Sequence, residues 1–270
     1  MSMRVRDVLM QGLGELRYEP IDKRIRGVIG DEAVVDSTRT RLVWEPGRVV
    51  PSYAVPAGDI AAEIGPAADG IHPPPADLPR LGARPILDPK IPFAVHSTDG
   101  EAVTLRHDGR EAAGFRPSDA DLEGYVIVDF DAFDAWYEED ERNVSHPRDP
   151  FHRIDIVHSS RHVRVELGGE VLAESSRPYL LFETHLPVRL YLPAEDVRTD
   201  LMTPTDTSSW CAYKGQASYW AYGDAGDVAW TYRAPLREAA EVTDRIAFFN
   251  ERVDVVIDGE RRERPVTPWS

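Results

Sequence analysis

The stretch that decides the fold is residues 161–183, RHVRVELGGEVLAESSRPYLLFE. Within it, residues 163–167 alternate apolar and polar side chains, which is typical of a half-buried strand. A Gly-Gly turn then leads into the apolar residues 171–173, so the segment predicts a β-hairpin. Residues 179–182 predict a further strand. We therefore expect a mainly β protein with antiparallel sheets, small and curved or barrel-like, and few short helices.

Working outward, the chain matches itself. Residues 26–60 can be laid over residues 164–197, at a spacing that stays constant as far as a tyrosine pair and then drops by one. The polar positions kept in both copies are Ser37/Ser175, Arg39/Arg177, Glu45/Glu183, Tyr53/Tyr191 and Asp59/Asp196. Self-similarity in the same order along the chain is the signature of a repeated structural unit.

The match resumes further on. Residues 96–102 (HSTDGEA) align with residues 211–217 (CAYKGQA), at a shorter spacing than before. The first copy explains the difference, because residues 65–92 contain eight prolines and predict an inserted loop. The second copy crosses the same gap with residues 198–210. We therefore predict two tandem β domains, residues 17–145 and 146–270.

Helices are scarce in this pattern. Residues 131–142 carry aromatic side chains on one side and four acidic residues near the end, and they predict a short acidic helix that joins the two copies. Residues 193–201, with acids early, predict one further short helix.

Composition limits the class of protein. The chain has 270 residues, a formal net charge of −16 and a single cysteine. The acidic charge disfavours binding to phosphate backbones, so no nucleic-acid partner is expected. One cysteine cannot form an intramolecular disulfide, and residues 1–20 lack the apolar run of a signal peptide. Without a run of about 20 apolar residues, no membrane partner is expected either, and the expected location is cytoplasmic.

These segments resemble a bacterial and fungal family described as domain of unknown function 427. In the second copy the resemblance lies in residues 161–183 and in YLPAEDV, CAYKGQASYW, AWTY and IAFFNERVD. In the first copy it lies in VDSTRTRLVWEP and PSYAVPAGDI. The family usually has proline after the cysteine, where this chain has Ala212. The resemblance implies a compact, curved antiparallel β domain, and the family's label suggests nucleotidyl transfer.

The positions shared by both copies have two interpretations. In the structural one, an Arg and a Glu on adjacent strands form a bidentate pair, and a Tyr hydroxyl and an Asp complete the polar network. In the functional one, Arg177 clamps an anion, with Tyr191 as hydrogen-bond donor and Glu183 beside it, since arginine suits planar anions.

The second copy also has reactive residues that the first copy lacks. Cys211 and Lys214 stand where the first copy has His96 and Asp99. A cation three residues away could activate the thiol as a nucleophile, while the alternative is a small buried cysteine. For Lys214 the alternative to a catalytic or anchoring role is a solvated turn lysine. The aromatic candidates for ligand walls are Tyr213, Tyr219, Trp220 and Trp230, and their alternative role is core packing.

Several motifs do not occur. The chain has no phosphate-binding Gly-rich loop with Lys-Ser/Thr and no Gly-x-Ser-x-Gly elbow. Its clustered histidines match no standard zinc spacing, so no metal site is predicted and the cofactor is left open; they are His146, His152, His158 and His162.

These observations leave three hypotheses. The first is a small-molecule-binding or enzymatic protein with its site in the second copy, in which Lys214 and Arg177 anchor the ligand and Cys211 acts as nucleophile. The second is a non-catalytic interaction module with aromatic grooves. The third is nucleotidyl transfer, which rests on the family label. Whether the protein is an enzyme, and its oligomeric state, stay open.

Overall fold

The computed structural model describes residues 2–5, 8, 10–67, 72–81 and 84–267. The chain forms two compact units, Met1–Asp149 and Pro150–Ser270, referred to below as unit 1 and unit 2. The expectation of a mainly β protein with antiparallel sheets is confirmed. The sheets are open rather than closed into barrels, since each has two edge strands among the described residues. No helix in this part of the chain is long and apolar enough to pass through a bilayer.

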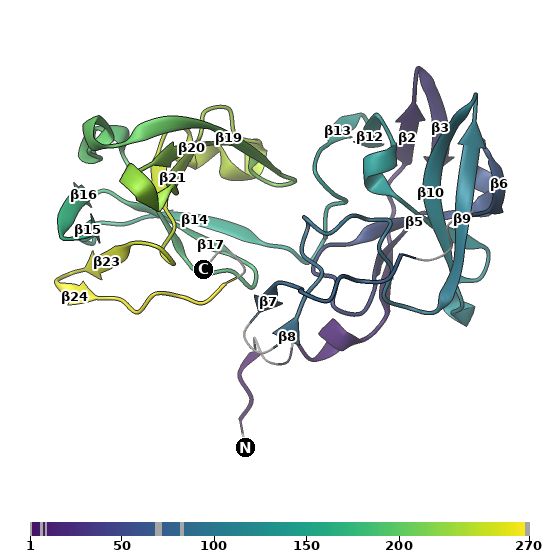
Figure 1. The fold of residues 1–270 in the computed structure, drawn as a ribbon, viewed down its shortest axis with the longest axis horizontal. Coiled ribbons are helices and arrows are strands. Elements are labelled where there is room, and N and C mark those ends of the chain that lie inside the picture. Colours follow the sequence, from purple (N-terminus) through teal and green to yellow (C-terminus); the bar gives the residue numbers. More distant parts are fainter. Residues whose placement is uncertain (1, 6–7, 9, 68–71, 82–83, 268–270) are drawn as a thin grey trace. The chain divides into compact units, whose positions relative to one another are not determined.

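Unit 1 contains a seven-stranded and a four-stranded sheet that share one apolar core (Figure 1). The larger sheet has the order β1 (Arg17–Pro20), β4 (Arg41–Trp44), β5 (Ser52–Pro56), β11 (Tyr125–Val128), β10 (Arg110–Pro117), β9 (Gly100–His107) and β6 (Glu63–Pro66). The smaller sheet has the order β13 (Glu141–Asn143), β12 (Ala135–Glu138), β2 (Ile25–Ile29) and β3 (Glu32–Ser37). Ile25 and Trp136 of the smaller sheet and Leu42 of the larger one are buried together.

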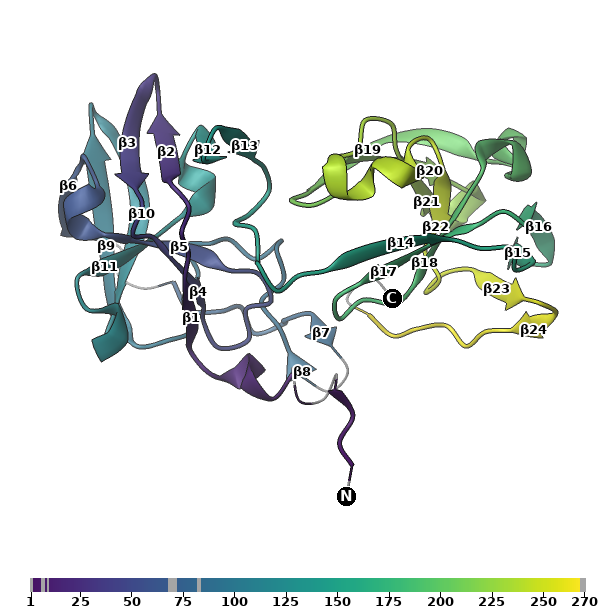
Figure 2. The ribbon, with the colours of Figure 1, turned by 180° about the vertical axis from the view of Figure 1, so that it is seen from behind.

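Unit 2 contains the same two kinds of sheet (Figure 2). The larger one has the order β14 (Ile154–His158), β17 (Tyr179–Glu183), β18 (Arg189–Leu192), β22 (Ile246–Phe248), β21 (Asp227–Tyr232), β20 (Gly215–Ala221) and β19 (Thr203–Cys211). The smaller one has the order β16 (Glu170–Ser175), β15 (Val163–Leu167), β23 (Asp254–Ile257) and β24 (Glu260–Arg261). The face of the larger sheet that packs on the smaller one is called its inner face, and the opposite face its outer face.

The two units correspond strand by strand. Each strand of unit 2 takes the same place in chain order and in its sheet as a strand of unit 1, from β1 and β14 to β13 and β24. The hairpins β2–β3 and β15–β16 carry a register shift at the same place, after Gly27 and after Val165. This correspondence covers strands where the two sequences no longer match, and it supports the proposal of tandem copies.

The register corrects one pair of the sequence alignment. Tyr53 lies opposite Leu42, whereas Leu190 lies opposite Leu180, the residue that corresponds to Leu42. Tyr53 therefore corresponds to Leu190 and not to Tyr191. Tyr53 belongs to the core between the sheets, while Tyr191 packs on the outer face. A slip of one residue moves a side chain to the opposite face of a strand, which is why letter matching misplaced this pair.

The acidic joining helix predicted at residues 131–142 is wrong. After a short 3₁₀ helix, η4 (Phe130–Ala132), the chain forms the hairpin of β12 and β13. Glu139 has φ = 52°, which an α-helix does not allow. Pairing of β12 with β2 buries Trp136 under the sheet, and this tertiary contact outweighs the local helical pattern.

The helix predicted at residues 193–201 is two short 3₁₀ turns, η5 (Ala194–Asp196) and η6 (Thr199–Leu201). They are separated because Val197 makes a β-bridge with Ala173. The remaining 3₁₀ helices are η1 (Gln11–Gly14), η2 (Ala57–Asp59), η3 (Ala120–Leu122), η7 (Gly223–Ala225) and η8 (Arg237–Val242).

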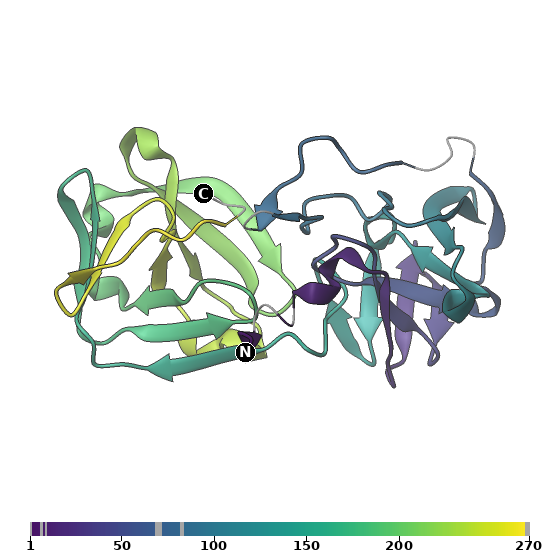
Figure 3. The ribbon, with the colours of Figure 1, turned by 90° about the horizontal axis from the view of Figure 1, so that it is seen from below.

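The Pro-rich segment of unit 1 is more than a solvent loop. It carries a small hairpin, β7 (Arg80–Leu81) with β8 (Arg84–Pro85), and runs along one side of the unit 1 strands, in blue in Figure 3. Leu87 of this segment is buried, and the fully buried Arg48 donates to the carbonyl oxygens of Ile91 and Pro92 at 3.3 and 3.2 Å. The segment is therefore packed into unit 1.

Candidate functional site

Unit 2 carries two groups of candidate residues on opposite faces of its larger sheet. Successive side chains of a strand point to opposite faces. On β17, Leu180 packs into the core between the sheets, whereas Leu181 packs on the outer face with Tyr191 and Trp230. The next residue pair follows the same alternation, so that Phe182 lines an inner cavity and Glu183 belongs to the outer face.

On the outer face, Glu183 holds two cationic or ionisable partners. Its Oε1 lies 3.0 Å from His152 Nε2, and its Oε2 accepts a hydrogen bond from Lys214 Nζ. Lys214 is only 8 % exposed, so this is a buried ion pair. The ring of Tyr213 stacks on His152 with a centroid distance of 4.2 Å. Glu183, Lys214 and Tyr213, all predicted as site residues, therefore lie together, and His152 is a partner that sequence spacing did not reveal.

The electrostatics of this cluster limit its chemistry. Burial would raise the pKa of Glu183, but the nearby Lys214 cation and the His152 hydrogen bond lower it to about 2. Burial would likewise lower the pKa of Lys214, but the Glu183 carboxylate outweighs it and raises that pKa above its ordinary value. Lys214 therefore stays an ammonium ion at neutral pH, and an ammonium ion cannot act as a nucleophile or base. Its charge is also largely offset by Glu183.

The corresponding carboxylate of unit 1 has different partners. Glu45 is fully buried and lies 3.0 Å from His96 Nδ1, with a second hydrogen bond from the backbone N–H of Ser97 at 3.0 Å. His96 aligns with Cys211, and its ring stacks on Phe115. Both units thus bury a glutamate at this position, but only that of unit 2 is paired with a lysine.

Cys211 lies at the end of β19, opposite Gly215, and the residue is partly exposed. It is close enough to Lys214 and Tyr191 to influence their charge equilibria. Burial raises the pKa of Tyr191 to about 12, and its hydroxyl accepts a hydrogen bond from Trp230 Nε1 at 3.1 Å. Cys211 is thus a partly exposed residue near a buried lysine.

The predicted aromatic walls do not all lie on this face. Tyr219 packs with Trp230 and Tyr191 on the outer face, and its hydroxyl lies 2.5 Å from Ser209 Oγ. Trp220, the next residue, packs against the core on the inner face. Strand alternation therefore separates Trp220 from the other predicted aromatic residues.

Arg177 belongs to an Arg–Asp–Ser cluster that both units share and that is called the latch below. Its guanidinium is exposed and donates to Asp196 Oδ1 at 2.9 Å, while Ser175 Oγ donates to the same carboxylate at 2.6 Å. In unit 1, Arg39 and Ser37 bind Asp59 in the same way. The expected Arg–Glu pair is therefore wrong, because the arginine of each copy binds the aspartate. The latch accounts for the conserved spacing of these residues in the two halves.

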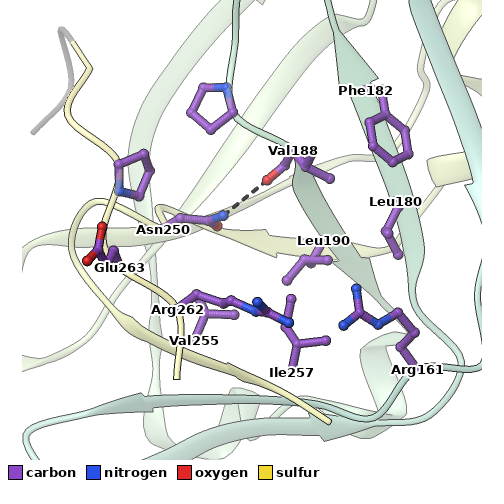
Figure 4. A pocket seen from close by; sticks show the side chains of 12 residues that line it. Arg161, Leu180, Phe182, Val188, Leu190, Asn250, Val255, Ile257, Arg262 and Glu263 are labelled. Carbon is purple, nitrogen blue, oxygen red and sulfur yellow. Dashed lines mark hydrogen bonds between the residues drawn. The ribbon is translucent and has the colours of Figure 1, made fainter. Parts of the chain in front are cut away.

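A cavity of about 320 Å³ opens on the inner side of unit 2 (Figure 4). It lies between β17 and β18 of the larger sheet, β23 of the smaller one and the segment after β24. Its apolar wall is formed by Leu180, Phe182, Pro187, Val188, Leu190, Val255, Ile257 and Pro265. Its polar lining consists of Arg161, Asn250, Arg262 and Glu263. This volume lies at the lower end of the roughly 300–1,000 Å³ typical of ligand sites.

The polar groups of the cavity are held by neighbouring residues. Asn250 Nδ2 donates to the carbonyl oxygen of Val188 at 3.0 Å, which ties the loop after β22 to the start of β18. Arg161 Nε donates to Asp258 at 2.6 Å. In Figure 4 the guanidinium groups of Arg161 and Arg262 point toward one another across the opening.

None of the predicted site residues lines this cavity. Arg161, Leu180 and Phe182 lie in the very segment that decides the fold, but strand periodicity marks them only as core or surface. The signal that could have found the cavity is a comparison of side-chain size between the copies, and it needs the strand register.

A known family model matches the sequence of unit 2. Residues 155–259 match the family model of a domain of unknown function (DUF427). The match spans all of β15 to β23, and with them the Glu183–Lys214 pair and most of the cavity wall. No curated protein matches the chain significantly. Among the described residues, no three His, Cys, Asp or Glu side chains come together as a potential metal site.

Proposed function

We propose that the protein binds a small molecule and that its ligand site is the cavity of unit 2. The observation that supports this proposal is the cavity itself. It has an apolar wall of eight side chains and a polar opening, the combination that small-molecule sites use for affinity and orientation. The proposed site is in unit 2, where the sequence also predicts a site, but it is on the inner side of the sheet.

A thermal-shift screen of the full chain tests this proposal. A ligand that binds the folded state raises the melting temperature by mass action. The matched control is Leu190→Phe. The phenyl ring is larger than the leucine side chain, so it reduces the volume of the cavity without adding charge. We expect organic acids, alcohols or amines with apolar bodies to raise the melting temperature of the wild type and to have little effect on Leu190→Phe. Equal shifts in both proteins, or no shift with any compound, would contradict the proposal.

A second candidate is catalysis at Cys211, with Lys214 as the neighbouring cation. It is favoured by the partial exposure of Cys211 and by its position at the β19–β20 turn, which also carries Lys214. The alkylation rate of Cys211 with iodoacetamide, followed against pH in the wild type and in Lys214→Met, measures its reactivity. A midpoint well below about 8.5 in the wild type supports a nucleophile. A midpoint at or above that value contradicts it.

A further inference from the structure

The register relates the cavity to a filled region of unit 1. Glu138 of β12 pairs with Ile25, and Ile257 of β23 pairs with Val163, the residue that aligns with Ile25. Glu138 and Ile257 therefore occupy the same place in the two units. The same register makes Val255 the counterpart of Trp136.

In unit 1 this place holds a buried carboxylate. Glu138 is 8 % exposed, and its Oε1 accepts a hydrogen bond from the Tyr53 hydroxyl at 2.8 Å and one from Asn143 Nδ2 at 3.3 Å. Its Oε2 accepts one from Lys23 Nζ at 2.5 Å. The donors thus converge on one carboxylate from three different strands or loops.

Unit 2 lacks that carboxylate and has two arginines at the positions where unit 1 has Lys23 and Asn143. The counterparts of Tyr53 and Glu138 are Leu190 and Ile257, both apolar and both in the cavity wall. The counterpart of Lys23 is Arg161, two residues before β15. The counterpart of Asn143 is Arg262, because Asn143 lies opposite Trp136 and the backbone N–H of Arg262 donates to Val255. All four counterparts line the cavity.

Two like charges therefore flank an apolar cavity at the place where unit 1 has its own anion. Each arginine has one acidic partner on the surface, Asp258 for Arg161 and Glu260 for Arg262. The third acidic residue, Glu263, lies at the opposite end of the cavity from Arg161 in Figure 4. A guanidinium carries five N–H donors in a planar fork, so each arginine can bind a carboxylate while keeping its surface partner.

We propose, building on the proposed ligand site, that the ligand of unit 2 is an amphipathic organic carboxylate. Its carboxylate binds between Arg161 and Arg262 and replaces the missing side chain of the Glu138 position. Its apolar body fills the space that Tyr53 and Trp136 occupy in unit 1, against Leu190, Val255 and Ile257. The binding step makes and breaks no covalent bond.

The test compares three probes of equal length by isothermal titration calorimetry of the full chain: octanoate, octanol and octylamine. We expect octanoate to bind at least about tenfold more tightly than octanol, since a charge-assisted hydrogen bond contributes more than a neutral one. Octylamine should bind most weakly, because its charge repels the arginine pair. The two variants Arg161→Gln and Arg262→Gln should each remove most of the preference for octanoate over octanol.

Two further variants keep the test specific. Ile257→Glu places the carboxylate of unit 1 into the cavity, where it can pair with both arginines, and should abolish octanoate binding; Ile257→Gln, of the same size but neutral, should retain part of it. Arg39→Gln removes an exposed arginine of unit 1 that pairs with Asp59, and should leave binding unchanged.

The outcomes separate this proposal from the ligand site itself. Octanol binding as tightly as octanoate, or undiminished octanoate binding in Ile257→Glu, overturns the carboxylate assignment and leaves the cavity as a neutral ligand site. Octylamine as the tightest ligand overturns it as well. Binding of all three probes that Leu190→Phe does not weaken overturns the proposed site.

Discussion

Units 1 and 2 share a strand order but use the space between their sheets differently. Unit 1 fills this space with Trp136 and with the carboxylate of Glu138. The ring centroid of Trp136 lies 5.0 Å from that of Tyr53 and 4.4 Å from that of Phe133. Unit 2 has Val255, Leu190 and Ile257 at these positions and a cavity of about 320 Å³. Backbone hydrogen bonds between strands define the architecture, so side-chain size at a few wall positions can change without altering the fold.

The outer faces differ in a second way. Unit 1 buries Glu45 against His96, and unit 2 buries Glu183 against Lys214 and His152. Burying a charge is costly unless it is paired, so the second glutamate depends on its lysine. Corresponding positions of the two units can therefore hold a glutamate paired with histidine in one and a glutamate in an ionic cluster with lysine in the other.

The largest expected effect comes from breaking the ionic cluster. Lys214→Met leaves the buried Glu183 carboxylate without its cation and should reduce the free energy of unfolding by roughly 3–5 kcal/mol. Urea denaturation of the full chain, with hydrogen exchange assigning the loss to residues 150–267, measures it. In the double variant Glu183→Leu/Lys214→Met most of the loss should be regained, and a double variant as unstable as the single one would contradict the account.

Removing a large side chain from the core of unit 1, so that it resembles unit 2, should reduce the free energy of unfolding slightly less. Trp136→Val removes the ring packed on Phe130, Phe133 and Tyr53 and should cost about 3 kcal/mol of unfolding free energy. Hydrogen exchange should localise the loss to strands β2 and β12. The variant at the matching position of unit 2, Val255→Ala, should cost about 1 kcal/mol, because its side chain already borders a cavity. Equal losses would mean that the two inner regions are packed alike.

The acid dependence of stability tests the lowered pKa of the buried Glu183. The folded-state pKa of Glu183 is about 2, below its ordinary 4.5, so its contribution is complete above the unfolded value. As the pH falls from 4.5 toward 2, the unfolded state binds the proton first, and about 3 kcal/mol of stability is lost. Denaturation midpoints of wild type and Glu183→Gln over this pH range measure the effect. A wild-type slope identical to that of the variant would argue against the lowered pKa.

The smallest effect is expected at the latch, where the units are alike. Arg39→Ala and Arg177→Ala remove exposed partners of Asp59 and Asp196 and should each lower the melting temperature only slightly, by about the same amount, because solvent screens exposed ion pairs. Thermal melting of both variants in low and high salt provides the measurement. A loss confined to Arg177→Ala would restore a special role for this arginine in unit 2.

Much of this architecture could be predicted from the chain. The alternation of residues 163–167, the Gly168-Gly169 turn and the strand at residues 179–182 are local patterns, and the structure has β15, β16 and β17 there. Both glycines adopt positive φ, 62° and 87°. Because glycine adopts such angles most readily, the Gly-Gly pair indicates this turn in the sequence. The helix predicted at residues 131–142 is wrong, because pairing with the distant strand β2 makes part of that segment a strand.

The candidate site could be predicted only in part. The sequence predicts Glu183 and Lys214 as site residues of the same copy. Whether their side chains touch depends on how a strand and a turn that are distant in sequence come together. Arg177 looked like a ligand clamp because its aspartate partner was not recognised. Trp220 and Tyr219 looked equivalent, and strand alternation put them on opposite faces.

Hydrophobic periodicity, turn chemistry and self-similarity are properties of neighbouring residues, so the amino-acid sequence carries the β class, the hairpins and the repeated segments. The cavity, the pairing of Glu183 with Lys214 and the meeting of Arg161 with Arg262 depend on strand register. A shift of one residue moves a side chain to the other face of a sheet, as it does for Tyr53 and Tyr191. For that reason the tertiary structure alone decides where this protein is filled and where it is hollow.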